Sequence, residues 1–311
     1  MTDASHAHGH GHAHAHGTGT STGDRASQRK RLGITCALAA TYLVAEVIGG
    51  LWTGSLALLA DAGHMLSDVA ALALSLFALW LSDRPSPVAH TFGYRRIEIL
   101  AALANGVALV VVAIFIVVEA FRRIESPQPV LGVPMLGIAA GGLLVNLIAL
   151  WTLHGGRDDS LNMRGAWLHV LSDALGSVGA MIAGGLIWGF GWMIADPIAS
   201  IIIAGLVLHA SWALLRETVD VLLEAAPSSL DVGELELALV DVPGVAAVHD
   251  LHVWTITSGM TSLSCHVGSD GSHDHHDVLT ALQLLLRERY AIHHVTIQVE
   301  PKGFEEQVDV C

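Results

Sequence analysis

Six long apolar segments dominate the sequence and limit the folds that the chain can adopt. They cover residues 32–52, 56–81, 97–121, 131–153, 165–189 and 194–215. A helix needs about 20 apolar residues to span a bilayer, and every segment reaches that length. Short stretches with turn-forming residues separate them, such as Gly189-Phe190-Gly191. The pattern predicts an α-helical membrane protein with six transmembrane helices.

The composition agrees with a location in the bilayer and limits the partners of the chain. Of its 311 residues, 52% are hydrophobic and 14% are charged, whereas soluble domains have about 25% charged residues. The three cysteines lie too far apart for a disulfide framework or a thiolate metal site. From Glu224 onward, fourteen acidic residues stand against three basic ones. Such negative charge repels nucleic acid and attracts cations, so we expect no nucleic-acid partner.

The distribution of basic residues predicts the orientation of the helices. Lysine and arginine gather in the N-terminal arm and in the second and fourth loops, whereas the first and fifth loops have none. Loops on the cytoplasmic side carry such an excess. Arg122 and Arg123, at the far end of the third segment, are exceptions. Because the number of spans is even, we expect both termini in the cytoplasm.

The sequence predicts three further regions around the membrane domain, which covers residues 32–223. Residues 1–31 form a His-rich arm of low complexity, which we expect to be disordered, and such tracts often bind metal. Residues 224–301 predict a small cytoplasmic α+β domain with helices on one face of a sheet, and residues 302–311 form a C-terminal tail. Within the α+β domain we expect helices at 231–240 and 276–289 and strands at 245–256, 261–268 and 292–299.

One short motif occurs twice and brings charged residues into the membrane. HMLSD, from His64 to Asp68, lies in the second apolar segment, and HVLSD, from His169 to Asp173, lies in the fifth. In each copy the histidine and the aspartate are one helical turn apart, so they share a face. An aspartate in mid-bilayer costs about 2.5–3.5 kcal/mol on insertion scales. No lysine or arginine lies within the six segments to balance these carboxylates.

A divalent cation held between the second and fifth segments would provide the missing positive charge. Two imidazoles and two carboxylates make four ligands, which is the number that zinc takes in tetrahedral sites. A single copy of the motif could instead serve helix–helix hydrogen bonding, as Ser67 and Ser172 could, but the duplication favours a metal site. Asp61 is a candidate for orienting the ligands or lining the access path. For other polar residues in the segments we expect interhelical hydrogen bonds or helix caps rather than metal ligation: Glu46, Asn105, Asn146 and Asp196.

Three motifs together resemble a known family of membrane proteins. They are the paired HxxxD motifs, HTFGYRRIE at 90–98 and HDLHVW at 249–254. Over residues 30–301 the chain resembles the zinc-transporting branch of the cation diffusion facilitators. The resemblance implies a homodimer, in the bacterial inner membrane, that exports zinc from the cytoplasm in exchange for protons. It also implies a ferredoxin-like, metallochaperone-like C-terminal domain that binds regulatory zinc.

The resemblance also bears on the identity of the cargo. Family members that select manganese or iron tend to have aspartate in place of the histidine of the second span. Histidine stands at both positions here, as His64 and His169. This favours zinc as the transported metal, with cadmium or cobalt as further cargo.

Cytoplasmic ligands are likewise implied by the resemblance. His249, His266, His276 and Glu300 fall where the family places metal ligands. The run HDHHD at 273–277 leaves open which of its histidines takes that role, and Gln298 stands where some relatives have another histidine. His90 corresponds to a loop ligand of some relatives, with a capping or surface role as the alternative.

Three other classes of function remain to be weighed. An intramembrane metalloenzyme, such as a zinc protease or a di-iron oxidase, would also place metal ligands in the bilayer, but the chain has no HExxH motif. A passive metal channel would conduct zinc without responding to a pH gradient. A sensor without transport would not need ligands in mid-membrane.

Overall fold

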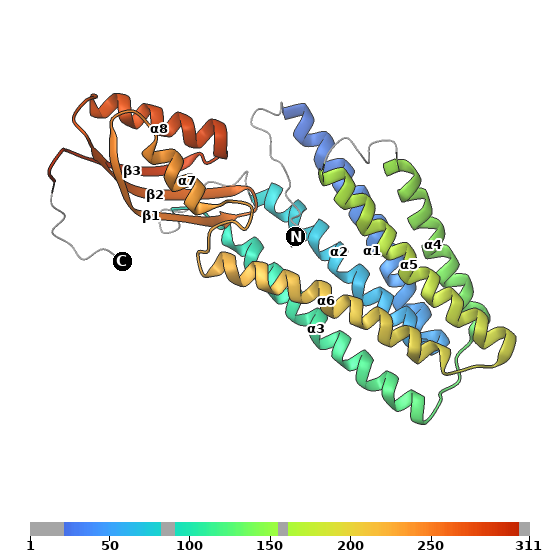
Figure 1. Cartoon of the computed structure of the whole chain (residues 1–311). Helices are drawn as coiled ribbons and strands as arrows, with labels where there is room; N and C mark the ends of the chain where they lie inside the picture. Colours follow the sequence, from blue (N-terminus) through green and yellow to red (C-terminus); the bar gives the residue numbers. More distant parts are fainter. Residues whose placement is uncertain (1–21, 82–90, 155–160, 305–311) are drawn as a thin grey trace, which may run out of the picture. The chain divides into compact units, whose positions relative to one another are not determined.

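The predicted fold class is confirmed by a computed structural model that describes residues 22–81, 91–154 and 161–304 (Figure 1). Some side chains at helix ends are also outside the described part, including that of His169. Six helices come first: α1 (Thr22–Thr53), α2 (Leu56–Leu81), α3 (Arg96–Glu125), α4 (Gly132–His154), α5 (Leu161–Phe190) and α6 (Ala195–Leu222). Helix α1 begins before the first apolar segment, within the stretch that the sequence assigns to the arm.

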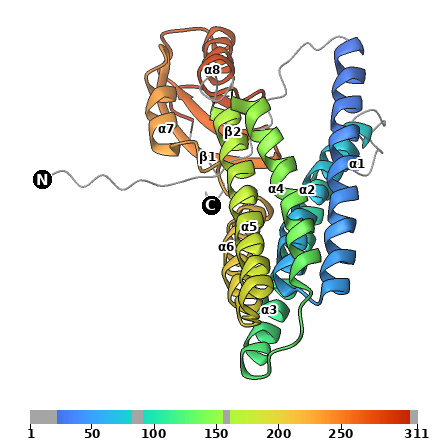
Figure 2. The same cartoon turned by 90° about the vertical axis from the view of Figure 1, so that its right-hand side faces the viewer.

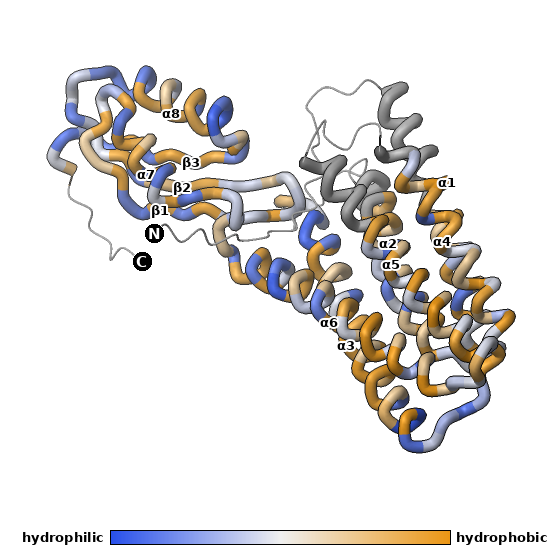
Figure 3. Tube along the Cα trace, turned by 45° about the vertical axis from the view of Figure 1, so that its right-hand side comes forward, coloured by the Kyte–Doolittle hydropathy of each residue, from blue (hydrophilic) through white to orange (hydrophobic). Residues whose placement is uncertain are grey.

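All six helices are long and apolar enough to cross a membrane. Large apolar side chains are exposed on their outward faces, among them Val111, Ile148 and Ile202, and Figure 3 shows the apolar colouring along α3 to α6. In water such surface would be unfavourable, whereas lipid tails solvate it. The chain divides into two compact units, and the boundary along the sequence falls between residues 216 and 217, within α6.

Small residues let neighbouring helices pack closely in the membrane unit. Helices α4 and α5 lie side by side in Figures 1 and 2. A Cβ at Gly132 would lie 2.9 Å from the backbone nitrogen of Trp188, and one at Gly184 would lie 3.2 Å from that of Leu136. Larger residues would push the two backbones apart. Close approach through glycine is a common basis for helix association in membranes.

A buried carboxylate joins the start of α6 to the start of α2. Asp196 is 0% exposed, and it accepts hydrogen bonds from the Ser55 hydroxyl at 2.6 Å and from the backbone nitrogens of Leu56 and Ala57 at 2.9 and 3.1 Å. These amides are among the four that a helix leaves unpaired at its N-terminus. Asp196 on α6 therefore caps α2, in agreement with the interhelical hydrogen bond or helix cap expected of it.

Arg123, which is an exception to the distribution of basic residues among the loops, has a structural role. Its side chain pairs with Glu119 one turn earlier, with Nε 3.1 Å from Oε1, and donates to the carbonyl of Gly54 in the α1–α2 turn. Gly54 has a φ of 74°, a conformation that glycine adopts without strain. Because Arg123 is fixed by these partners, it is a weak guide to the side of the membrane.

The second unit is an α+β domain with one three-stranded sheet. Its strands are β1 (Val245–Thr257), β2 (Met260–Ser269) and β3 (His294–Glu300), and its helices are α7 (Val232–Val240) and α8 (His275–Tyr290). The strands lie in the order β1-β2-β3, with β1 antiparallel and β3 parallel to β2. Side chains from both helices and the sheet form a single core, including Leu239, Leu263, Val267 and Leu282. Both helices begin with an aspartate cap, at Asp231 and Asp274.

Candidate metal sites

The repeated motif brings three of its four predicted ligands together between α2 and α5. His64, Asp68 and Asp173 each offer one ligand atom, and these atoms lie within 4.8 Å of one another. His64 Nε2 is 2.9 Å from Asp173 Oδ1. The side chains of His64 and Asp173 are 21% and 16% exposed. The cluster is therefore shielded from bulk solvent while part of its surface stays accessible.

Helix geometry and a glycine explain why these side chains meet. His64 and Asp68 are four residues apart on α2, so they project from one face of the helix. Helix α5 comes close at Gly176, where a Cβ would lie 3.1 Å from Asp61 Oδ1. A larger side chain there would press on the carboxylate of α2. The glycine therefore permits the short distance between the helices that the ligand cluster needs.

The other predicted membrane ligands have different positions. His169 lies on α5, one turn before Asp173, but its side chain is outside the described residues, as is the whole of His90. Asp61 is 5% exposed and lies one turn before His64, outside the cluster of three. Asn105 Nδ2 donates to Ser67 Oγ at 3.4 Å, which is the interhelical hydrogen bond expected of it.

The donor chemistry of the membrane cluster suits a borderline divalent cation. One imidazole and two carboxylates supply nitrogen and oxygen ligands, which are common partners of Zn²⁺ in proteins. Two carboxylate charges would balance the charge of the ion. In their current arrangement the His64 and Asp173 side chains contact each other directly, and an ion could replace this contact.

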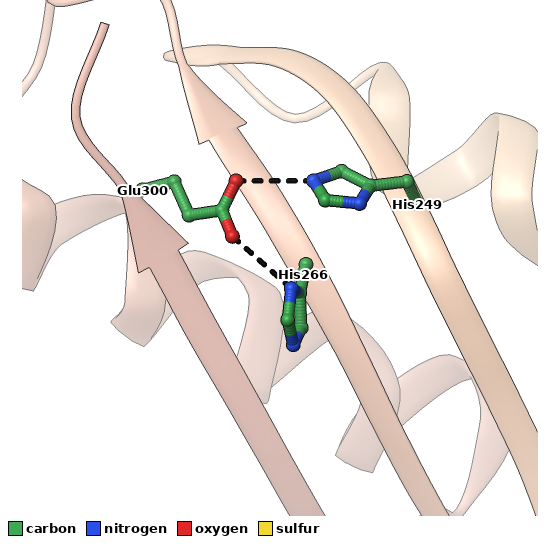
Figure 4. Close-up of side chains that lie close together, drawn as sticks. All are labelled: His249, His266 and Glu300. Atoms are coloured by element: carbon green, nitrogen blue, oxygen red, sulfur yellow. Dashed lines mark hydrogen bonds and ion pairs between the residues drawn. The ribbon is translucent and has the colours of Figure 1, made fainter. Parts of the chain in front are cut away.

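A second cluster lies on the sheet of the cytoplasmic domain (Figure 4). His249 on β1, His266 on β2 and Glu300 at the end of β3 place their ligand atoms within 4.8 Å of one another. Each carboxylate oxygen of Glu300 contacts one histidine: Oε2 is 3.0 Å from His249 Nε2, and Oε1 is 3.1 Å from His266 Nδ1. The imidazole rings stand edge to face, with centroids 5.3 Å apart.

Strand alternation sets which side chains can join the cytoplasmic cluster. Successive residues of a strand point to opposite faces, so His266 lies on the face opposite to Cys265 and Val267, which belong to the core. Burial raises the pKa of the Cys265 thiol to about 11, so this residue is a neutral core side chain. The cluster face therefore offers imidazole and carboxylate ligands.

The charge of Glu300 is favoured by its surroundings. Burial opposes its ionisation, but hydrogen bonds from His249 and Gln298 and the nearby imidazoles outweigh that effect, and the pKa of the carboxyl is lowered. Gln298 Nε2 donates to Glu300 Oε1 at 3.1 Å. Gln298 thus orients Glu300 at a position where some relatives have a histidine. The lowered pKa keeps Glu300 available as a negatively charged oxygen ligand for a metal ion.

Two other residues of the cytoplasmic domain bear on the composition of the cluster. His276 is exposed in the first turn of α8, where its backbone nitrogen donates to Asp274, and it is outside the cluster of three. Asp250 was not predicted to take part, yet its Oδ2 lies 4.0 Å from His266 Nε2. Its other oxygen is 2.9 Å from His252 Nε2. An irregular register between His249 and His252 and a φ of 49° at Asp250 produce this position.

Two family descriptions cover nearly all of the two units. Residues 33–223 match the family described as cation efflux transmembrane domain. Residues 227–302 match the one described as cation efflux protein, cytoplasmic domain.

Individual relatives extend over most of the chain. The zinc transporter ZitB of Escherichia coli is 47% identical over 273 residues, which are 87% of this chain and 87% of the relative. The cadmium, cobalt and zinc/H(+)-K(+) antiporter of Bacillus subtilis is 42% identical over 285 residues, covering 90% and 91%. The metal cation efflux system protein CzcD of Cupriavidus metallidurans is 45% identical over 273 residues, covering 87% and 86%.

Proposed function

The chain belongs to the cation efflux family and is an integral membrane transporter rather than an enzyme. On this premise we propose that it exports zinc from the cytoplasm in exchange for protons. The observation that carries the proposal is the convergence of His64, Asp68 and Asp173 between two membrane-spanning helices. We include His169 as the fourth ligand, because it lies one turn from Asp173 on α5.

The coupling follows from competition between protons and zinc for the same groups. Two carboxylates neutralise the charge of a bound zinc ion, and the imidazoles must be unprotonated to bind it. On the proton-richer side, these groups take up protons and release the metal. The protonated groups no longer require a cation, so the empty site can return to the cytoplasmic side. Coupling requires that the site opens to one side at a time.

The choice of cargo follows from the ligand types. Imidazole suits zinc, whereas sites built from carboxylate, carbonyl and water ligands suit manganese, magnesium and calcium. A site with His64 and His169 is therefore expected to prefer zinc, with cadmium and cobalt as further substrates. The relatives are named for these same three metals.

We place both termini in the cytoplasm and the chain in the bacterial inner membrane as a homodimer. The excess of basic residues in the arm and the second and fourth loops supports this orientation. The match of residues 227–302 to the cytoplasmic domain of cation efflux proteins supports the position of the C-terminal domain. We keep residues 1–31 as a His-rich arm and 302–311 as a tail.

Transport can be tested with the purified protein in liposomes that contain a pH-sensitive dye and a zinc dye. Addition of external zinc is expected to raise the lumenal pH while zinc enters, because each inward zinc ion is exchanged for protons. Protein-free liposomes provide the control. Zinc entry that is insensitive to an imposed pH gradient would indicate a passive channel. Metal binding without any flux would indicate a sensor.

We also propose that the cytoplasmic cluster is a regulatory zinc site. His249, His266 and Glu300 supply ligands that suit zinc, and we retain His276 as a candidate further ligand. The acidic C-terminal domains of two protomers repel each other. Positive charge at the cluster would reduce this repulsion, so cytoplasmic zinc is expected to tighten the dimer of these domains and to raise transport.

His266→Ala is expected to abolish the zinc-induced compaction of the cytoplasmic domains. The change removes one of three clustered ligands, and Glu300 loses a partner 3.1 Å away. Distance measurements between spin labels on the two C-terminal domains, with and without zinc, would detect it. His252→Ala is the matched control, since His252 lies on the same sheet but pairs with Asp250. Equal zinc-induced compaction in the wild type and His266→Ala would contradict the regulatory role.

A further inference from the structure

A glutamate in the last quarter of α1 is buried, and its carboxylate makes no well-formed hydrogen bond within the described part of the chain. Glu46 is 0% exposed, and both of its carboxylate oxygens are buried with no hydrogen bond of good geometry among the described residues. Burial of an unpaired carboxylate in an apolar environment is very unfavourable. The sequence predicts an interhelical hydrogen bond or a helix cap at Glu46, and no hydrogen bond of good geometry to its carboxylate is found among the described residues. Glu46 therefore needs another explanation.

The polar groups around Glu46 come from three helices and are rich in oxygen. The Glu46 carboxylate lies next to the carboxylate of Asp61 on α2 and the hydroxyl of Tyr42 on α1. Asp61 in turn interacts with the hydroxyl of Ser177 on α5, a residue that is buried. These pairwise contacts bring two carboxylates and two hydroxyls into one neighbourhood.

Glycines make room for this group of side chains. A Cβ at Gly142 on α4 would overlap the Tyr42 hydroxyl and lie 3.2 Å from Ser177 Oγ, so no larger residue fits there without moving them. Gly176 on α5 allows Asp61 to approach in the same way, at 3.1 Å. Glycines on α4 and α5 thus leave room for these polar side chains.

The group lies one helical turn from the zinc cluster. On α2, Asp61 precedes His64 by three residues, which is about 4.5 Å along the axis at a rise of about 1.5 Å per residue. On α5, Ser177 follows Asp173 by four residues, and α5 runs in the opposite direction if the spans alternate. Both displacements lead toward the end of the membrane unit that holds the α1–α2 and α5–α6 turns. In the proposed orientation this is the outer side.

We propose that Glu46 and Asp61, with the hydroxyls of Tyr42 and Ser177, form a second divalent-cation site on the outward path of the metal. Its two carboxylates match the charge of a divalent ion, and its all-oxygen ligands hold zinc less tightly than imidazole does. A metal leaving His64 and Asp173 would therefore find a weaker site one turn further out. The role as a step in export rests on the proposed function, whereas the binding of a cation here does not.

Manganese is a suitable probe, because oxygen-rich sites accept Mn²⁺. The full-length protein in nanodiscs would be titrated with Mn²⁺ at fixed pH, and free Mn²⁺ would be measured by electron paramagnetic resonance. Glu46→Gln is expected to bind one Mn²⁺ fewer per chain than the wild type, and Asp61→Asn is expected to lose the same ion. Glu125→Gln, which changes an exposed glutamate at the end of α3, is expected to bind as many as the wild type.

A combination of variants shows whether the two clusters are separate. Glu46→Gln with Asp173→Asn is expected to bind two Mn²⁺ fewer than the wild type, because each change removes a different site. Equal binding by the wild type and Glu46→Gln would overturn the inference, as would a double variant that loses no more than Asp173→Asn alone. Elution of each variant at the wild-type volume in size-exclusion chromatography would establish that it is folded. Both of these results concern Mn²⁺ binding, whereas the proposed function is tested by zinc/proton exchange of the wild type in liposomes. Failure of the second site can therefore be distinguished from failure of the proposed function.

Discussion

Asp173→Asn is expected to reduce zinc-driven proton flux by at least about 100-fold, since loss of a group that only orients a metal ligand already costs about 10–100-fold. The change keeps the size of the side chain but removes a negative charge from the cluster. The remaining ligands would then leave part of the zinc charge unbalanced in the membrane. Asp173 also lies 2.9 Å from His64 Nε2, so the variant changes the position of a second ligand. Lumenal pH in zinc-challenged proteoliposomes measures the effect.

Ser172→Ala provides the matched control for this experiment. Ser172 is the neighbour of Asp173 on α5, but it is exposed on a different face of the helix. Its replacement should leave the flux within about twofold of the wild-type value, because substitutions away from special contacts change free energies by about 0.5 kcal/mol or less. Undiminished zinc flux through Asp173→Asn would rule out this aspartate as a transport ligand.

Asp196→Ala is expected to prevent stable folding of the membrane unit. The substitution leaves two backbone amides and a hydroxyl at the start of α2 without their acceptor. Each buried group that loses its partner costs about 1–3 kcal/mol, so a loss of at least about 3 kcal/mol follows from the three groups together. Total stabilities of about 5–15 kcal/mol leave little margin for such a change. The yield of monodisperse protein and its melting temperature in detergent would report it.

Two comparisons separate capping from the loss of a negative charge in general. Asp220→Ala removes an exposed carboxylate near the end of the same helix, and its melting temperature should stay close to that of the wild type. Asp196→Asn keeps one acceptor oxygen, so its melting temperature should lie between those of Asp196→Ala and the wild type. A wild-type melting temperature for Asp196→Ala would contradict the capping role.

The positions of the helices and strands could be predicted because they follow from local patterns. The apolar segment at 56–81 coincides with α2, and the predicted strand at 245–256 corresponds to β1 at Val245–Thr257. Membrane helices satisfy their own backbone hydrogen bonds, so length and polarity suffice to locate them. The turn signal at Gly189 to Gly191 marks the end of α5 at Phe190, and Gly191, directly after the helix, has a φ of 66°.

The membrane cluster could be predicted because the motif occurs twice. A single copy is compatible with either helix–helix hydrogen bonding or metal binding. The prediction that α2 lies beside α5 rests on the assumption that both copies bind the same ion. The structure brings His64, Asp68 and Asp173 together. Glu46 belongs to no repeated motif. Whether its carboxylate finds a hydrogen-bond donor depends on which helices surround it. A single glutamate in an apolar segment does not reveal those neighbours.

The residues of the cytoplasmic cluster are harder to select from the sequence, because their arrangement depends on the tertiary fold. Asp250 approaches His266 through an irregularity in β1 that has no clear sequence signature. His276 was implied by family resemblance within a run of histidines, whereas its exposed position follows from where α8 begins. Residues adjacent along a strand point in opposite directions, so an error of one residue in register would exchange ligands and core.

The position of Glu300 between two histidines means that one ion would connect all three strands of the sheet. The ligands lie on β1, β2 and β3, whose pairing exists only in the folded domain. Zinc at a hundred times its dissociation constant would add about 2.7 kcal/mol to the unfolding free energy of the domain. The melting temperature of the cytoplasmic unit would therefore increase with the zinc concentration in the cell. Its rate of proteolysis would decrease in the same way, because proteases cleave the unfolded state.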